Sequence, residues 1–158
     1  MAVCYLSTPI GSLEIKGDNY GICEISFVDT SSKVSDEIPP VLQQCHSELS
    51  EYFEGKRTDF NFNLNPNGTE FQRKVWAELM KVPVGKTISY LELSQKMGDV
   101  KAIRAVAAAN GKNPLAIVIP CHRVIGKNGD LVGYAAGIPR KKWLLEFENP
   151  SNQISLFQ

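Results

Sequence analysis

The sequence lacks long apolar runs, paired cysteines and a net charge, and it contains only two histidines. No apolar run approaches the roughly 20 residues that a membrane-spanning helix needs. The N-terminus also lacks a basic region followed by an apolar stretch, which would indicate an export signal. A composition of 43% hydrophobic and 22% charged residues is typical of a soluble globular protein. We therefore expect a cytoplasmic protein with no membrane partner.

The four cysteines show no C-x-x-C spacing, which argues against a redox motif or a common zinc motif. A zinc site built from Cys4, Cys23, Cys45 and His46 is an alternative, but the spacing of these residues matches no usual ligand pattern. Cys23 lies in an expected strand and Cys45 on the apolar face of an expected helix. Both are predicted to be buried thiols, and no metal or other cofactor is expected.

Charge is strongly segregated along the chain although the total is zero. Residues 81–142 contain 11 basic and three acidic residues, a net charge of +8, and the remainder of the chain carries −8. Such segregation favours a polyanionic partner for the basic part. Chance clustering on a solvated surface is the alternative that charge alone leaves open.

The first part of the chain has the pattern of a small α/β domain, predicted at residues 1–65. Short alternating runs separated by turn residues predict strands. Apolar residues at steps of three and four predict a helix that is closed by Gly55. The expected strands are residues 4–8, 11–16, 22–27 and 60–64, and the expected helix is residues 41–53. Residues 65–68, Asn-Pro-Asn-Gly, are the best candidate for a linker.

The remainder, residues 66–158, is predicted to be a helical domain. Thr69 with Gln72, and Ser89 with Glu92, form capping boxes that each begin a helix. The second of these helices stops at Gly98, and another helix follows at residues 101–110. Two short helices joined by a glycine-containing turn are typical of a helix-turn-helix unit. The chain as a whole is therefore predicted to be α+β.

The second helix of this unit is unusually rich in alanine. Helices that read bases usually carry Arg, Asn or Gln. A face of alanines instead lets the helix approach a DNA groove closely without preference for a base sequence. Alanine is also simply the best helix former. The residues alone leave both interpretations open.

A reactive thiol is suggested by residues 117–125, in which an apolar run, predicted as a strand, leads into Pro120. Cys121, His122 and Arg123 follow directly. Cysteine reacts as the thiolate, so a reactive cysteine needs a base and positive surroundings. In the sequence, His122 is expected to supply the base and Arg123 the positive charge. Because neighbouring residues on a strand point to opposite faces, His122 is expected to act through a water molecule or a turn. A buried structural cysteine is the alternative for so short a motif.

The wider pattern resembles one family. Pro-Cys-His-Arg-Val at residues 120–124 is preceded by Asn113-Pro114 and followed by Gly133-Tyr134, and Gly-Lys-Thr-Ile-Ser-Tyr stands at residues 85–90. These motifs, with Glu-Tyr-Phe-Glu-Gly-Lys-Arg at residues 51–57, are similar to those of the O6-alkylguanine-DNA alkyltransferases, the methylated-DNA–protein-cysteine methyltransferases. The resemblance implies a ribonuclease H-like first domain and a winged-helix or helix-turn-helix second domain.

The resemblance also implies roles for individual residues. Cys121 matches the alkyl acceptor and His122 the base that deprotonates it through a water molecule. Glu148 matches the carboxylate that orients the histidine, and Tyr90 the phenol that donates a proton to guanine N3. The implied substrate-binding residues are Tyr134, Ala135, Asn113 and Lys141, with Asn113 as a hinge and Lys141 near the rim of the base pocket. The implied DNA-binding residues are Arg104, Ala105, Gln72, Asp99 and Lys127, with Arg104 as the finger that fills the base stack.

The implied activity is the irreversible repair of O6-alkylguanine, and of O4-alkylthymine, in double-stranded DNA. The damaged nucleotide would be turned out of the duplex by a monomer that binds the minor groove without sequence preference. No residue here would hydrolyse the thioether product, so each molecule would act once. Some relatives have serine where this chain has Ala135, which puts the preferred alkyl size in doubt.

Two other functions stay open from the sequence. A non-catalytic DNA-binding protein would not need Cys121, which this chain retains. A Cys-His hydrolase or acyl transferase would need a reusable nucleophile and an oxyanion site, and it would leave the alanine-rich helix without a purpose. Mass gain on the protein separates the three.

Overall fold

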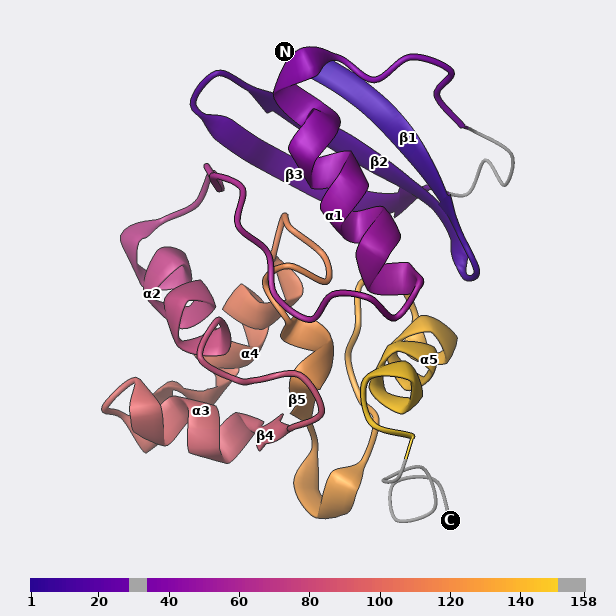
Figure 1. Cartoon of the computed structure of the whole chain (residues 1–158). Coiled ribbons are helices and arrows are strands. Elements are labelled where there is room, and N and C mark those ends of the chain that lie inside the picture. The colour runs from indigo at the N-terminus through magenta and orange to yellow at the C-terminus, as the bar shows by residue number, and fades with distance from the viewer. Residues whose placement is uncertain (29–33, 151–158) are drawn as a thin grey trace. The chain divides into compact units, whose positions relative to one another are not determined.

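The computed structural model describes residues 1–28 and 34–150, and within it the chain divides into two units. The first contains residues 1–67 and 114–118, and the second contains residues 68–113 and the chain from residue 119 onward. Residues 151–158 of the predicted second domain lie outside the described part. Figure 1 labels the elements of both units.

The first unit is built on a three-stranded antiparallel sheet in the order β1-β2-β3. Its strands are β1 (Ala2–Thr8), β2 (Gly11–Asp18) and β3 (Gly21–Val28). The β2–β3 turn requires Gly21, whose φ of 142° is costly for other residues and whose missing Cβ would lie 2.9 Å from the carbonyl oxygen of Asn63. The three predicted strands are confirmed, and each is slightly longer than expected.

A helix covers one face of this sheet (Figure 1). A 3-10 turn, η1 (Pro40–Leu42), leads into α1 (Gln43–Phe53). Cys45, Leu49 and Tyr52 are buried, as expected for positions three and four residues apart on one helix face. The fourth predicted strand, residues 60–64, is wrong, because only Leu64 forms an isolated bridge, with Ile22 of β3.

Five residues from the later part of the sequence belong to the first unit. Residues 114–118 lie beside β3, where the Ile25 amide donates to the Pro114 carbonyl over 2.8 Å and Leu115 bridges to Ile25. Ile117 has a φ of 73°, a conformation that β-branched residues rarely adopt. The apolar run at residues 117–119 is therefore a turn, and its prediction as a strand is wrong.

The second unit consists mainly of helices, and both predicted capping boxes are present. Thr69 and Gln72 begin α2 (Glu70–Leu79), and Ser89 and Glu92 begin α3 (Tyr90–Lys96). After η2 (Val100–Ala102), α4 (Ile103–Gly111) completes the helix-turn-helix unit. The indole nitrogen of Trp76 donates to the Ala109 carbonyl over 2.9 Å and joins α2 to α4.

Short elements and one long helix complete the second unit. Strand β4 (Ile88–Ser89) pairs in parallel with β5 (Val124–Ile125). Strand β5 directly follows the turn η3 (Cys121–Arg123), and η4 (Lys127–Gly129) and α5 (Ile138–Glu148) come after it along the chain. This arrangement places the Cys-His-Arg motif directly before a strand.

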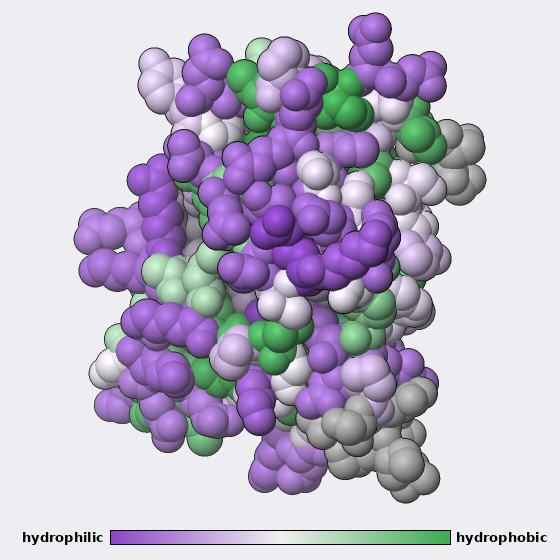
Figure 2. Space-filling model, in the orientation of Figure 1, coloured by the Kyte–Doolittle hydropathy of each residue, from purple (hydrophilic) through white to green (hydrophobic). Residues whose placement is uncertain are grey.

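No described helix is long and apolar enough to cross a membrane. On the face drawn in Figure 2, hydrophobic residues form small patches among hydrophilic ones. Among residues 1–28 and 34–150, no group of three or more His, Cys, Asp or Glu side chains is placed to hold a metal ion.

Candidate active site

Cys121 begins the 3-10 turn η3 and is 7% exposed. Its amide donates to the Ile119 carbonyl over 2.8 Å, and the Arg123 amide donates to the Pro120 carbonyl over 3.0 Å. In a 3-10 turn successive side chains are about 120° apart, so the opposite-face argument for a strand does not apply to His122. This is the turn that the sequence left as an alternative to a strand.

His122, Arg123 and Glu148 form a buried charged cluster. The Nε2 atom of His122 lies 2.8 Å from one Glu148 oxygen, and Arg123 donates to both oxygens over 2.8 and 2.9 Å. The third Arg123 contact is the Val82 carbonyl, at 2.7 Å. Burial opposes ionisation of Glu148, but His122 and Arg123 outweigh it and hold the pKa of this carboxyl below its ordinary range. Glu148 is therefore a carboxylate.

The carboxylate fixes the histidine tautomer. A carboxylate only accepts hydrogen bonds, so the Nε2 atom of His122 carries the proton and Nδ1 is the acceptor. That Nδ1 atom is buried and has no hydrogen-bond partner among the described residues. Burial lowers the pKa of His122 despite the opposing effect of Glu148. His122 is thus a neutral imidazole with a vacant basic nitrogen, as a general base requires.

The thiol itself is held neutral. Burial raises the pKa of Cys121, although hydrogen bonding from Asn113 and the charge of Lys141 act in the opposite direction. The expectation that Arg123 makes the surroundings positive is wrong, because its charge is neutralised by Glu148. Formation of the thiolate therefore depends on proton transfer to a base rather than on a permanently ionised sulfur.

Asn113 lies where a hinge residue was expected. Its side-chain amide donates to the Ile119 carbonyl over 2.7 Å and also hydrogen-bonds the Cys121 thiol. The residue follows α4 closely, so it connects the helix-turn-helix unit to the turn that carries the cysteine. This contact agrees with the implied hinge position.

Lys141 does not lie at the rim of a pocket. Its side chain is fully buried, and its Nζ atom donates to the carbonyls of Val124, Val132 and Gly133. Burial lowers its pKa to about 8. The expected rim placement is wrong, and the three carbonyls show instead that Lys141 holds the chain after the active-site turn against α5.

Two phenols lie near the thiol. Burial raises the pKa of Tyr90, and the Cys121 charge adds to this shift. The Tyr90 hydroxyl donates to the Val132 carbonyl over 3.3 Å. The Tyr134 hydroxyl is buried and has no hydrogen-bond partner in the described structure, burial raises the pKa of this phenol, and its ring centroid lies 6.5 Å from that of His122. Ala135 follows it and is exposed.

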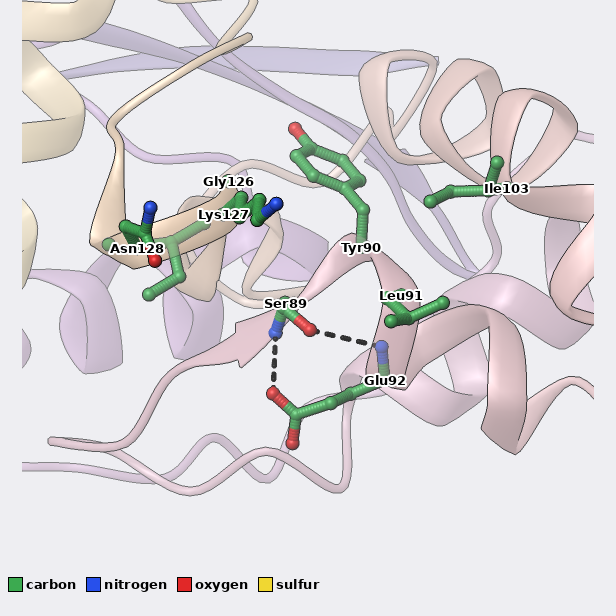
Figure 3. A pocket seen from close by; sticks show the side chains of 10 residues that line it. Ser89, Tyr90, Leu91, Glu92, Ile103, Gly126, Lys127 and Asn128 are labelled. Carbon is green, nitrogen blue, oxygen red and sulfur yellow. Dashed lines mark hydrogen bonds between the residues drawn. The ribbon is translucent and has the colours of Figure 1, made fainter.

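A pocket of about 680 Å³ lies beside Tyr90. Figure 3 shows Tyr90 projecting from the start of α3 between Ile103 of α4 and the loop that carries Lys127, while Ser89 and Glu92 bond reciprocally below it. The lining of this pocket therefore includes two residues to which the resemblance assigned different roles, the phenol Tyr90 and the DNA-binding candidate Lys127.

The other DNA-binding candidates lie on the surface of the helical unit. Arg104, Ala105 and Asp99 are exposed, and Asp99 caps η2 through the Lys101 amide. Gln72 is half-buried and its side-chain oxygen accepts from the Thr69 amide. The helix α4 thus presents Arg104 beside alanine methyl groups, as the sequence pattern predicted.

Comparison with known proteins agrees with this geometry. Residues 70–150 match the family model described as 6-O-methylguanine DNA methyltransferase, DNA binding domain. Residues 1–66 match the model of the ribonuclease-like domain of the same methyltransferases. The chain belongs to the 6-O-methylguanine DNA methyltransferase family. The resemblance noted in the sequence and the predicted fold class are both confirmed.

Relatives of this methyltransferase family match over nearly their whole length. The methylated-DNA–protein-cysteine methyltransferase of Methanosarcina acetivorans is 39% identical over 155 residues, which is 94% of this chain and 98% of the relative. That of Mycolicibacterium paratuberculosis is 41% identical over 96% of this chain and 94% of its own. The crystal structure of Mycobacterium tuberculosis OGT in complex with DNA is 37% identical, covers 100% of both chains and has a TM-score of 0.84.

Sequence reasoning missed two contributors to the methyltransferase site. Arg123 was interpreted as a positive neighbour of the thiol, but it anchors Glu148, a residue 25 positions away. Asn110 was not considered, although it is buried near Tyr90. Neither the Arg123–Glu148 contact nor the position of Asn110 near Tyr90 has a local sequence signal, because both depend on how the chain folds.

Cys23 departs from its prediction and Cys45 does not. Cys45 is buried and burial raises its pKa, whereas Cys23 is partly exposed, with its sulfur 3.3 Å from that of Met1. The prediction that Cys23 lies in the core is wrong, because its position on β3 faces away from the buried side.

Proposed function

We propose that this chain repairs O6-alkylguanine in DNA by transferring the alkyl group to Cys121. The observation that carries the proposal is the buried, unpartnered Nδ1 of His122, the residue that directly follows Cys121, on an imidazole that the buried carboxylate Glu148 orients. The relatives are named for transfer from methylated DNA to a protein cysteine, and one relative has been crystallised with DNA. The acceptor in this chain is the cysteine of the Pro-Cys-His-Arg motif.

The reaction can be written with all atoms balanced. The thiol proton passes to His122 Nδ1 through a water molecule, and the thiolate attacks the alkyl carbon. The sulfur–carbon bond forms as the carbon–O6 bond breaks, and the electron pair of that bond goes to the guanine. Tyr90 protonates guanine N3, and the proton held by His122 restores the phenol through solvent. The products are guanine and a Cys121 thioether, so each molecule acts once.

The mode of DNA binding is part of the proposal. The exposed Arg104 beside exposed alanines on α4 suits a helix that enters the minor groove without reading bases while an arginine replaces the flipped nucleotide. Ala105, Gln72, Asp99 and Lys127 would contact the backbone or groove nearby. We propose that the protein acts as a monomer in the cytoplasm, at the nucleoid, and also accepts O4-alkylthymine. No cofactor is required by this chemistry.

One experiment tests the activity. The protein is incubated with duplex DNA that contains a single O6-methylguanine, and its intact mass and peptide map are measured. We expect a stable gain of one methyl group on Cys121, with one lesion lost for each protein molecule. DNA binding without mass gain would indicate a non-catalytic binding protein, and turnover without mass gain would indicate a hydrolase.

Arg104 provides a separate test of the binding mode. Arg104→Ala is expected to weaken binding to lesion-containing duplex by about tenfold, on the order of the value of one good Arg contact, and to slow repair of duplex DNA. Repair of a free O6-alkylguanine base should change little, because no nucleotide has to be turned out. Equal losses on the free base and the duplex would contradict the finger role.

A further inference from the structure

Asn110 is a buried residue that the mechanism above does not use. It lies near the C-terminal end of α4 and is 3% exposed. Its side-chain oxygen, Oδ1, has no hydrogen-bond partner within the described residues. A buried amide oxygen without a donor is unfavourable, and such groups are rare in folded proteins unless a ligand or water completes them. This oxygen is therefore a candidate ligand contact.

The other half of the same amide faces Tyr90. A side-chain hydrogen bond from Asn110 lowers the pKa of the Tyr90 phenol against the opposing effects of burial and Cys121. A hydrogen bond lowers the pKa of a phenol when the phenol oxygen accepts it, because the bond then stabilises the phenolate. The donor to the Tyr90 oxygen is therefore the amide nitrogen of Asn110, since the amide oxygen can only accept. The vacant Oδ1 belongs to the same planar group and lies next to the phenol. A donor, the Tyr90 hydroxyl, thus stands beside an acceptor, the Asn110 oxygen.

Guanine presents the complementary pair. The ring nitrogen N3 is an acceptor, and the neighbouring carbon carries the 2-amino group, one of whose hydrogens lies on the N3 side. We propose that Asn110 recognises this 2-amino group, its Oδ1 accepting the hydrogen bond while Tyr90 donates to N3. The inference rests on the proposed function, in which Tyr90 faces N3.

The same contact discriminates between lesions. Thymine carries an oxygen, O2, where guanine carries the 2-amino group. An alkylated thymine in the pocket would therefore direct an acceptor at the Asn110 oxygen, and two acceptors cannot form a hydrogen bond. Asn110 thus makes the site selective for alkylguanine over alkylthymine.

Two modified bases test this contact directly. Transfer rates are measured by intact mass for duplexes that contain O6-methylguanine or O6-methylhypoxanthine, which is the same base without the 2-amino group. The unaltered protein is expected to prefer methylguanine by about tenfold, the order expected for one buried hydrogen bond. In Asn110→Leu this preference should fall to about one. Any effect that passes through Tyr90 slows both lesions and cancels in the ratio.

Two further variants serve as controls. Asn110→Asp keeps an acceptor oxygen but loses the amide donor, so both rates should fall while the preference for methylguanine is retained. Asn61→Leu replaces an exposed asparagine of the first unit and should change neither rate. If Asn110→Leu does not fold, Asn110→Ala is measured in its place.

The outcomes are distinct. An unchanged preference in Asn110→Leu overturns the inference, as does an unaltered protein that repairs both lesions equally. An unaltered protein that gains no methyl group from either duplex overturns the proposed function itself.

Discussion

Each of the two units buries one glutamate against an arginine, and the two pairs differ in a way that separates structure from chemistry. In the first unit, Glu48 is held by Arg57 at 3.6 Å, by the Gln44 side chain and by the backbone N–H of Asn61. In the second, Glu148 is held by Arg123 at 2.8 and 2.9 Å and by His122.

The two ion pairs differ in the other groups that each glutamate contacts. Every described contact of Glu48 fixes a helix or a loop of the first unit. Glu148 instead orients an imidazole whose second nitrogen is vacant. A buried ion pair is by itself weak evidence for function, but a buried pair that leaves a base open on the residue directly after a buried cysteine is strong evidence for it.

The largest contrast is expected between two buried cysteines. Cys121→Ala should abolish alkyl transfer and leave DNA binding nearly intact, because it removes the nucleophile without altering the exposed face of α4. The matched change in the first unit, Cys45→Ala, removes a thiol whose pKa burial raises and should leave transfer unchanged. Mass spectrometry and a duplex-binding titration measure both. Loss of binding in Cys121→Ala would contradict the separation of roles.

The two glutamates come next. Glu148→Gln should slow transfer by about 100-fold, since it removes the charge that orients the general base. It should also lower the free energy of unfolding by about 3 kcal/mol, because Arg123 stays buried without a countercharge. Glu48→Gln should cost about 1 kcal/mol and leave the transfer rate within about twofold. Similar rate losses in both variants would remove the distinction between the pairs.

Replacement of each arginine by lysine should have a smaller effect. Arg123→Lys keeps the charge but loses the paired donation to both Glu148 oxygens, and it should slow transfer by about tenfold, within the range of one misplaced catalytic group. Arg57→Lys changes a partly exposed partner and should cost less than about 1 kcal/mol of stability. Single-turnover kinetics and urea unfolding give the two values. A larger rate loss in Arg57→Lys would show that the first unit contributes to the chemistry.

The smallest effect concerns pH. Burial lowers the pKa of His122 below its ordinary 6.5, although Glu148 acts against this and Arg123 and Lys141 act with it. The base is therefore neutral at pH 6.5 and above, and transfer should change by less than about twofold between pH 6.5 and 8. Acidification below the lowered pKa should reduce it.

The free energy of unfolding should also fall as the pH is lowered. The unfolded chain binds a proton on His122 near pH 6.5 while the folded chain does not, so unfolding becomes easier as the pH falls through this range. Glu48→Gln should show the same pH profile for transfer as the unaltered protein. A rate that halves already between pH 8 and 7 would contradict a neutral buried imidazole.

Much of the fold was predictable because its signals are local. The strands β1 to β3 follow from alternation and turns, and the starts of α2 and α3 follow from the capping residues Thr69 and Ser89. The strand predicted at residues 117–119 failed because Ile117 adopts a left-handed conformation that its residue type disfavours. Its chain neighbours Pro114, Leu115 and Ala116 are fixed by contacts with Ile25 of β3, which lies far away in the sequence.

The site was less predictable because its geometry is non-local. Lys141 was expected near the rim of the base pocket, but its ammonium group is buried and donates to three backbone carbonyls. Arg123 was expected to make the thiol ionic, but it pairs with a residue 25 positions away. Family resemblance supplied Glu148, which no periodicity in the last helix would have singled out.

The five residues 114–118 make the two units inseparable by any single cut. The polypeptide leaves the helical unit after Asn113, adds a strand-like stretch to the sheet of the other, and returns at Ile119, two residues before Cys121. A fragment that begins at Gly68 would carry the buried Leu115 without Ile25 of β3, to which Leu115 bridges. Cys121 would then follow a segment that has lost its pairing partner in β3. The second unit is therefore expected to need the first unit in order to hold Cys121 in its native conformation.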